Sequence, residues 1–546
     1  LIYAFDVLMK IYMEYGYSER DAASEIVRNN LYGLDIDGRA TQLAYFSVMM
    51  KARQYDRRFF SRGIQPHIYE IIESNNADAH SVEYFCENNP TLKRDVGIVL
   101  DALKDAKEYG SILQIPKVDF EEINDRFEQL NADISIYGSY IFGDFRLLMR
   151  EAEVMSHKYA VVATNPPYFN KFDSKLKTYI NSNYKVYAGD LFSVFIYRNF
   201  MYCRQGGYTG FMTPFVWMFI KTYEVLRERV IRDKELTSLI QMEYSAYEEA
   251  TVPICSFVCM NGKNRGLGYY FRLSDFKGGM DIQNKKVIQA LENPDCGYYF
   301  ETNQENFTKI PGSPIAYWVQ ESFIHAIENS VPLGKEAFSF QGIITGDNKY
   351  FLRLWHEVSS ENMKTNIKNI ERNEYENVWV PYNKGGGFRR WYGNNEYLLR
   401  WIKQGKTLTR ARTENSQYYF REGVTWSFIT SSIFSCRYFP EGALWDVAGS
   451  SIFATKDVSI EYICALMNSK VAQLFFDITN PTINYQVMNI ISLPYMEGAN
   501  TEQICSKARE CIRISKEDWD SFETSWDFKT HPFVRICEDI KSKEID

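Results

Sequence analysis

The 546-residue sequence predicts an α/β fold in which helices cover an open, doubly wound sheet. Two segments support this prediction, residues 31–37 and residues 161–169. In each of them an apolar run stops abruptly at a polar residue, as at the end of a strand. The runs 207–214 and 236–242 are predicted as further strands. Helical patterns separate these runs, and such an alternation of strand and helix is typical of an open sheet.

The composition limits the number of domains and the class of protein. A chain of 546 residues is too long for one hydrophobic core, so we expect two or three domains. Aromatic residues make up 16% of the chain, with 39 Tyr and 37 Phe. Rings at this density suit base stacking, although an aromatic-rich core accounts for most of them.

Metal-ligand spacing is missing from the ten cysteines and six histidines, since no Cys-x-x-Cys pair occurs. We therefore predict no metal site, and we expect reduced, mostly buried thiols in a cytoplasmic protein. No apolar run reaches the length of a membrane span and no secretory leader is visible, so we expect no membrane contact.

The positive charge of the chain is concentrated in one region. The net charge is −8, which by itself argues against a nucleic-acid partner. Between Lys384 and Arg412, however, eight lysine or arginine residues stand against one acidic residue. A local basic face is all that a DNA-binding protein needs, so the overall charge does not exclude DNA.

Taken in order, the chain begins with helical patterns at residues 1–9 and 18–29, followed by the strand that ends near Asp35 and Asp37. A long helix is predicted over residues 39–60, and a polar, mostly helical insertion from about residue 61 to residue 133. The run 140–145 predicts a strand with Asp144 at its tip. After residue 169, an apolar helix is predicted within residues 187–202.

The segment 161–169 predicts a buried strand that leads into a rigid loop. Pro166 and Pro167 cannot continue a strand or a helix and lack N–H donors, so carbonyl oxygens near Asn165 face little local competition. With the ring of Tyr168 beside them, such acceptors suit a planar amine held by its two N–H hydrogens. Acceptors on those hydrogens would draw the nitrogen towards a nucleophilic form. The alternative is a strand-ending turn with an aromatic plug.

The sequence Asn165-Pro166-Pro167-Tyr168 after an apolar strand resembles the catalytic loop of S-adenosylmethionine-dependent amino methyltransferases, above all adenine-specific DNA methyltransferases. The wider chain resembles the PglX family of BREX phage-defence systems and, more loosely, the methylase part of fused restriction-modification enzymes. The resemblance implies a Rossmann-like catalytic domain followed by an α+β target-recognition domain. It also implies S-adenosylmethionine as cofactor, duplex DNA as substrate, and other defence proteins as possible partners.

The resemblance assigns roles to individual residues. Asn165, Pro166, Pro167 and Tyr168 would be catalytic, and Tyr168 would also stack on the target base. Asp35 would accept hydrogen bonds from the cofactor ribose, with Asp37 as the cap of the next helix, and Asp144 would lie near the cofactor adenine. Tyr247 would contact the flipped base, with Phe257 as its rival. In this family a glycine-rich cofactor turn precedes the first helix, and we expect this chain to begin just after it.

The resemblance divides the chain into a methyltransferase domain (residues 1–330), a target-recognition domain (residues 331–495) and a helical tail (residues 496–546). The segment at residues 385–394 combines glycines, two arginines and two large rings, which favours DNA contact over a packed turn. The predicted DNA-binding residues are Lys384, Arg389, Arg390, Trp391, Arg410 and Arg412.

Two alternatives remain open. Protein-glutamine methyltransferases resemble the same loop, because amide chemistry is equivalent, and only the basic, aromatic C-terminal half argues for DNA. A DNA-recognition fragment without catalysis is the second alternative, since the glycine-rich turn is absent from the sequence. No cluster of acidic residues with a nearby lysine indicates a nuclease.

Overall fold

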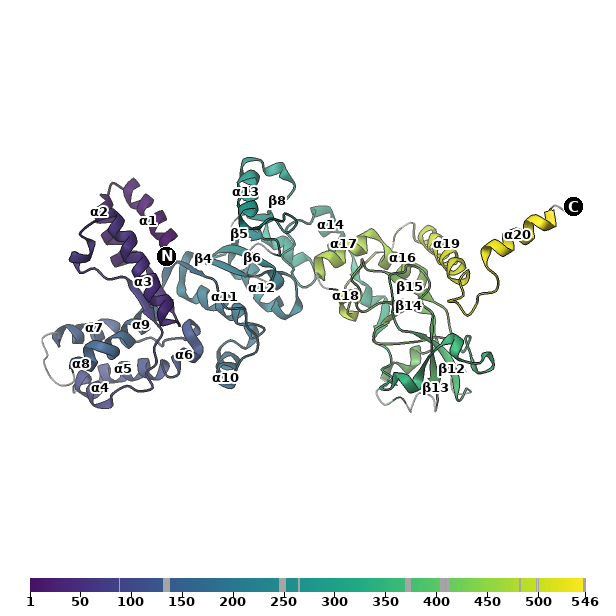
Figure 1. The fold of residues 1–546 in the computed structure, drawn as a ribbon, viewed down its shortest axis with the longest axis horizontal. Helices are drawn as coiled ribbons and strands as arrows, with labels where there is room; N and C mark the ends of the chain where they lie inside the picture. Colours follow the sequence, from purple (N-terminus) through teal and green to yellow (C-terminus); the bar gives the residue numbers. More distant parts are fainter. Residues whose placement is uncertain are drawn as a thin grey trace. The chain divides into compact units, whose positions relative to one another are not determined.

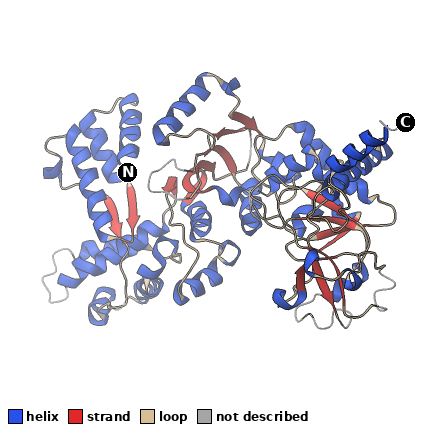
Figure 2. Ribbon diagram, turned by 45° about the vertical axis from the view of Figure 1, so that its right-hand side comes forward, coloured by secondary structure: helices blue, strands red, loops and turns tan. Residues whose placement is uncertain are grey.

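The computed structural model describes the chain except for residues 88, 131–137, 245–251, 264–265, 369–374, 403–407, 409–412, 481–482, 497, 499 and 544–546. It divides into two compact units (Figure 1). The first comprises Leu1–Phe215 with Arg229–Glu301, and the second Val216–Glu228 with Thr302–Asp546. Both units contain helices and strands, so the chain is mixed α/β, as the sequence predicts (Figure 2).

Helices form the N-terminal part of the first unit, as the sequence predicts: α1 (Ile2–Glu14), α2 (Glu19–Glu25) and α3 (Gly38–Tyr55). Ser18 caps α2 by accepting a hydrogen bond from the Asp21 N–H at 3.2 Å. Asp37 caps α3 in the same way, accepting from the Arg39 N–H at 2.8 Å, which confirms the expectation for this residue. These helices enclose a common apolar core.

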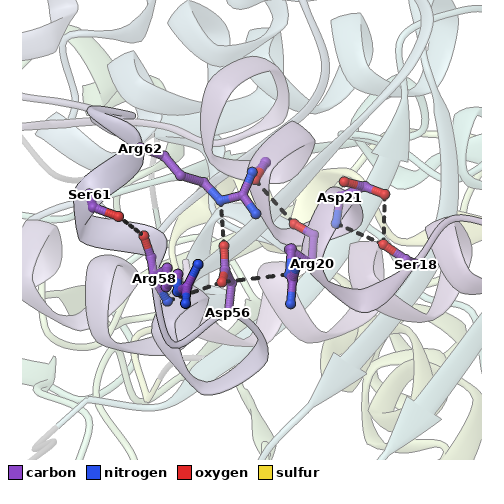
Figure 3. Close-up of polar contacts among 8 residues, drawn as sticks. Ser18, Arg20, Asp21, Asp56, Arg58, Ser61 and Arg62 are labelled. Carbon is purple, nitrogen blue, oxygen red and sulfur yellow. Dashed lines mark hydrogen bonds and ion pairs between the residues drawn. The ribbon is translucent and has the colours of Figure 1, made fainter.

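A buried carboxylate fixes the turn that follows α3. Asp56 accepts the Arg58 N–H at 3.1 Å and pairs with the guanidinium groups of Arg62 and Arg20 at 2.5 and 3.8 Å (Figure 3). Burial favours the neutral acid, but these hydrogen bonds and charges outweigh it and hold the pKa of Asp56 below its usual value. The cluster therefore ties this turn to α2.

The first strands are β1 (Tyr32–Asp35) and β2 (His67–Glu70), which pair in parallel with Asp35 opposite Glu70. The described part of the predicted insertion at residues 61–133 is mostly helical, as the sequence predicts, and it also contains the strand β2. The helices that follow it share one apolar core: α4 (Ala79–Cys86), α5 (Pro90–Ala102), α6 (Ala106–Tyr109), α7 (Phe120–Gln129) and α9 (Arg146–Ser156).

The segment 140–145 is helical, and the predicted strand with Asp144 at its tip is wrong. A short helix, α8 (Gly138–Tyr140), leads into the helical turn Ile141–Phe145, which is kinked at Gly143, and then into α9. Ile141 and Phe145 are fully buried and lie one turn apart, so both face the core of this helical region. The exposed Asp144 lies on this turn.

The central sheet of the first unit has six strands in the order β3-β4-β6-β5-β7-β8. β3 pairs in parallel with β4, whereas β6 runs antiparallel to both β4 and β5. The predicted strands at residues 207–214 and 236–242 are confirmed as β4 and β5, and the helix within residues 187–202 as α11. The strands are β3 (Tyr159–Thr164), β4 (Cys203–Pro214), β5 (Glu235–Gln241), β6 (Ile254–Met260), β7 (Gly268–Arg272) and β8 (Tyr299–Thr302), and the helices α10 (Ser174–Asn183), α11 (Leu191–Tyr202) and α13 (Gly279–Glu292). A further helix, α12 (Glu224–Asp233), has residues in both units.

Among its described residues, the second unit contains two four-stranded sheets, β10-β17-β14-β15 and β11-β13-β12-β16, and a short pair, β18-β9. Two apolar clusters that include Trp426 and Trp445 fill it. The strands are β9 (Val331–Pro332), β10 (Ala337–Phe340), β11 (Leu352–Leu354), β12 (Val378–Asn383), β13 (Tyr397–Trp401), β14 (Gly423–Trp426), β15 (Cys436–Phe439), β16 (Leu444–Trp445), β17 (Ser451–Ala454) and β18 (Pro494–Tyr495). The helices are α14 (Glu321–Glu328), α15 (Asn348–Phe351), α16 (Ile460–Asn468), α17 (Lys470–Thr479), α18 (Val487–Ile491), α19 (Thr501–Asp520) and α20 (Pro532–Lys543).

The cysteines agree with the sequence-based expectation. All ten are free thiols, and seven of them are buried. Within the described part of the chain, no helix is both long enough and apolar enough to cross a membrane.

Candidate functional site

The loop at residues 165–169 begins where β3 ends, at Thr164. Asn165, Pro167, Tyr168 and Phe169 are exposed, whereas Pro166 is buried. A β-branched and apolar strand stops here because two consecutive prolines cannot continue its hydrogen-bond ladder. The sequence therefore places a polar amide and an aromatic ring at the carboxyl end of a parallel strand.

Tyr168 is held over this loop by its hydroxyl group. The hydroxyl lies 3.1 Å from Asn165 Oδ1 and 3.2 Å from the carbonyl oxygen of Met212 on β4. The ring meets Phe192 of α11 edge to face, with centroids 6.4 Å apart. Tyr168 is 36% exposed, so its side chain is only partly covered by these contacts.

Asp190 anchors the other end of the loop and was not singled out from the sequence. Its Oδ1 atom accepts the N–H groups of Phe169 at 3.0 Å and Phe192 at 3.2 Å, and the Leu191 N–H donates to the Phe169 carbonyl oxygen at 2.8 Å. Burial raises the pKa of Asp190, although these backbone N–H groups oppose the rise. An acidic residue directly before an apolar helix is a cap signal, and it could have identified this residue.

Two carboxylates end the neighbouring strands β1 and β2. Asp35 Oδ1 accepts the Asp37 N–H at 2.9 Å, so Asp35 forms a tight turn before α3. Glu70 lies opposite Asp35 and pairs with Lys107 at 2.7 Å. Sequence reasoning missed Glu70 because residues 67–70 lack the apolar alternation that indicates a strand.

The strands β1 and β3 meet at their first residues. The rings of Tyr32 and Tyr159 lie 5.2 Å apart between centroids. Among the described residues, β1 pairs with β2 and with no other strand. β3 likewise pairs with β4 and with no other strand. Each of the two strands thus has one open edge, and Val161 of β3 is 65% exposed.

The predicted target-base residues have different outcomes. Tyr247 lies outside the described residues. Its rival Phe257 is 1% exposed and stacks on Phe211 inside the sheet, with centroids 4.9 Å apart, so the structure excludes it from contact with a base. Asp144 lies on a helical turn and not at a strand end.

In the second unit, the segment at residues 385–394 is a tight, glycine-dependent loop. Gly385, Gly386 and Gly393 have φ angles of +82°, +114° and +119°, which side chains rarely allow. Trp391 is half-buried. Its backbone N–H donates to the Cys436 carbonyl oxygen at 2.9 Å, and its side chain packs against the apolar cluster around Trp426. The exposed ring of this loop is Phe388.

The predicted DNA-binding cations are arranged around aromatic rings. The Arg389 guanidinium lies 4.8 Å from the Trp519 ring and 3.8 Å from Asp518, both on α19. Arg390 lies 5.8 Å from the Phe388 ring, and its Nε atom is buried without an acceptor among the described residues. Lys384 lies 5.3 Å from the Tyr397 ring. Arg410 and Arg412 lie outside the described residues.

A family comparison matches residues 29–247 to the Eco57I restriction-modification methylase family. The matched segment contains β1, β3 and the 165–169 loop. It therefore covers the part of the first unit in which the candidate catalytic residues and the candidate cofactor residues lie.

Two curated relatives match almost the whole chain. The adenine-specific methyltransferase PglX of Lacticaseibacillus casei (strain Zhang) is 34% identical over 558 residues, and the adenine-specific methyltransferase BrxX of Escherichia coli O9:H4 (strain HS) is 31% identical over 566 residues. Each alignment covers 97% of this chain and 46% of the relative, so the chain spans about half the length of these proteins.

Among solved structures, the Type ISP restriction-modification enzyme LlaGI, a nuclease-deletion mutant in complex with a DNA substrate mimic, is 11% identical to this chain. The match has a TM-score of 0.47 and covers 94% of this chain and 43% of that one.

Proposed function

We propose that this chain, a relative of the PglX-type adenine-specific methyltransferases, belongs to an enzyme that transfers a methyl group to the exocyclic amino group of adenine in duplex DNA. The activity would serve phage defence or restriction-modification. The observation that carries the proposal is the 165–169 loop, in which an exposed amide oxygen and an exposed tyrosine ring follow a parallel strand. The relatives bear the same activity in their names.

The loop residues would hold the amino group and the ring of the base. Asn165 Oδ1 and the Pro166 carbonyl oxygen would accept the two amino hydrogens, because neither proline has an N–H group that competes for them. Tyr168 would stack on the ring. Acceptors on both hydrogens direct the nitrogen lone pair away from the ring and towards the incoming methyl group. The proton can leave after transfer, so no base of unusual pKa is required.

S-adenosylmethionine is the proposed methyl donor, and when bound it supplies an electrophilic methyl group. Asp35 fits the ribose of such a molecule, because it is exposed and only its Oδ1 atom has a partner among the described residues. The second oxygen of the Asp35 carboxylate is left for a hydroxyl group. We also propose that Asp144, which lies on the helical turn Ile141–Phe145, is close to the adenine of the cofactor.

The strands of the first unit would form one doubly wound, Rossmann-like arrangement. The contact between Tyr32 and Tyr159, and the open edges that β1 and β3 leave, support this assignment. In such a sheet the carboxyl ends of parallel strands share one edge, so Asp35 and Asn165 would face the same crevice.

The target adenine would leave the duplex to reach this crevice, because its amino group is otherwise paired within the stack. The second unit would supply target recognition. The cations Lys384, Arg389 and Arg390 and the exposed ring of Phe388 are the groups that support this assignment.

Transfer of a labelled methyl group from S-adenosylmethionine to unmethylated duplex DNA tests the proposal. We expect label in adenine with the unaltered chain, and none with Asn165→Ala although DNA affinity is kept. Asn170→Ala is the matched control, since Asn170 is an exposed amide next to the loop.

Full transfer by the Asn165→Ala variant would overturn the assigned mechanism. DNA binding without transfer by the unaltered chain would support a recognition fragment, and label in protein glutamine would support the other methyltransferase class.

A further inference from the structure

A cavity of about 300 Å³ lies in the first unit at the amino end of β3. Residues 155–158, which immediately precede this strand, form one wall, and residues 114–120 and the side chain of Arg198 form others. The six residues of β3 span about 20 Å at roughly 3.3 Å per residue, so the strand separates this cavity from the 165–169 loop. The cavity is therefore distinct from the proposed methyl-transfer site.

The charges around the cavity are of one sign. The cations Lys117, Lys158 and Arg198 line it together with the imidazole of His157, and the lining residues include no carboxylate. Of the acidic residues near the lining in sequence, Asp119 caps α7 and Glu153 pairs with Arg150 at 3.1 Å. A cavity with this lining attracts an anion and has no group that repels one.

Arg198 is the innermost of these cations. It is 5% exposed, and its guanidinium lies 3.8 Å from the centroid of the Tyr202 ring. One terminal nitrogen donates to the Leu113 carbonyl oxygen at 2.6 Å, while Nε has no acceptor among the described residues. A buried donor on a charged group is costly to leave without a partner, so an anion in the cavity would relieve this cost.

Lys158 stands at the mouth of the same cavity. Its side chain is exposed, and its amino group donates to the Met201 carbonyl oxygen. Partial burial of Lys158 and the nearby charge of Arg198 lower its pKa, the Cys203 thiol opposes the shift, and no carboxylate is among its causes. An anion between the two cations would offset their repulsion.

The rest of the lining comprises two polar residues, Gln114 and Ser156, and the apolar side chains of Ile115, Val118, Phe120, Met155 and Met201. A volume of about 300 Å³ is at the small end of ligand sites. We propose that this cavity binds a small phosphate monoester, with the phosphate group on Arg198 and Lys158 and a compact apolar or aromatic body against the methionine and phenylalanine side chains. Phosphate matches the guanidinium better than a carboxylate of equal size does, because it offers more acceptor oxygens.

The phosphate could come from a free monoester or from the DNA backbone. A duplex carries its phosphates on a convex surface and would not reach a guanidinium buried as deeply as that of Arg198. We therefore assign a free monoester, and the experiment separates the two sources.

Acetylation of lysines, followed by mass spectrometry, locates the ligand on the chain. Phenyl phosphate at millimolar concentration is the probe because it contains no adenine and does not compete for the methyl-transfer site. Acetylation of Lys158 should fall several-fold with phenyl phosphate and remain unchanged with phenol. Lys177 on α10 is the internal control, since it is exposed and outside the cavity. Equal acetylation of Lys158 with and without phenyl phosphate would overturn the proposal.

A duplex that protects Lys158 when phenyl phosphate does not would likewise overturn it, in favour of a DNA contact. Calorimetry then tests the lysine: Lys158→Gln should weaken phenyl phosphate binding about tenfold, Lys158→Arg should restore most of it, and Lys177→Gln should leave it unchanged. Unaltered affinity in Lys158→Gln contradicts the assigned geometry. Neither measurement depends on methyl transfer, so failure of the proposed function would leave this result intact.

Discussion

The Tyr168 hydroxyl lies within hydrogen-bond distance of two oxygens, Asn165 Oδ1 at 3.1 Å and the Met212 carbonyl oxygen at 3.2 Å. A phenol has one hydrogen to donate, so the two oxygens share it. Asn165 Oδ1 has two lone pairs and can accept a second donor while this contact persists. The hydroxyl therefore orients the amide without using up its capacity as an acceptor.

Replacing Tyr168 by Phe removes this orientation and keeps the ring. We expect methyl transfer to slow about tenfold, which corresponds to the loss of one hydrogen bond. Tyr168→Ala should slow it further, because a stacking partner for the base is also lost. Initial rates of labelled methyl transfer measure both effects, with Tyr3→Phe, an exposed tyrosine on α1, as the control. Equal rates for Phe and Ala would contradict a stacking role.

Asp190 should support both stability and the loop. Asp190→Ala removes the cap of α11 and the acceptor of the Phe169 N–H, so we expect a loss of about 1–2 kcal/mol in the free energy of unfolding and slower methyl transfer. Asp173→Ala removes the cap of α10 only and is the matched control for the stability loss. Denaturant unfolding and transfer rates are the measurements. Identical transfer rates in the two variants would show that Asp190 does not position the loop.

Glu151 should make stability depend on pH. This fully buried carboxyl accepts the Ile72 N–H at 3.0 Å, and burial raises its pKa to about 8 from a usual value of 4.5. The folded state therefore holds a proton that the unfolded state releases between these values. The stability that this group contributes is complete below pH 4.5 and is lost as pH rises to 8, by about 1.4 kcal/mol per pH unit.

Glu151→Gln keeps the acceptor for the Ile72 N–H and carries no charge. It should raise the melting temperature near pH 8 and reduce the decline between pH 5 and pH 8, whereas Glu14→Gln, an exposed change on α1, should not. Thermal unfolding at a series of pH values measures this. A Gln variant with the same pH slope as the unaltered chain would assign the slope to other groups.

Arg389 should contribute to DNA affinity through its charge. Arg389→Ala should weaken binding to duplexes of any sequence and lower the salt slope of the affinity by about one. Asp518→Asn frees Arg389 from its acidic neighbour and should strengthen binding. Fluorescence anisotropy over a range of salt concentrations distinguishes the two directions. A stronger complex with Arg389→Ala would remove this residue from the DNA interface.

The sequence predicts elements well where one pattern has one structural solution. The run 161–164 is β-branched and apolar, and two prolines end it, so strand and loop are placed correctly, although β3 has no buried residue and the predicted burial of the strand is wrong. The run 140–145 has strand-forming residues as well, but Ile141 and Phe145 also satisfy the spacing of a helix, and the surrounding helices select that solution. Tertiary packing, not local preference, decides such a segment.

Parts of the candidate site depend on contacts that no local pattern contains. The strand at residues 67–70 has only four residues, and its pairing with β1 brings Glu70 beside Asp35 from over thirty residues away in sequence. Phe257 is a plausible base contact by its place in the chain, yet its strand turns the ring against Phe211 in the core. Side-chain direction in a strand follows from register, which one sequence does not determine.

The open edge of β3 also has a consequence for how the protein behaves at high concentration. Where β1 does not cover it, an unpaired strand edge with the exposed, apolar Val161 is a template for an extended segment of another molecule. We expect self-association of the chain to increase with concentration through this edge. Val161→Lys should suppress that association, because a charged side chain on an open strand discourages intermolecular pairing.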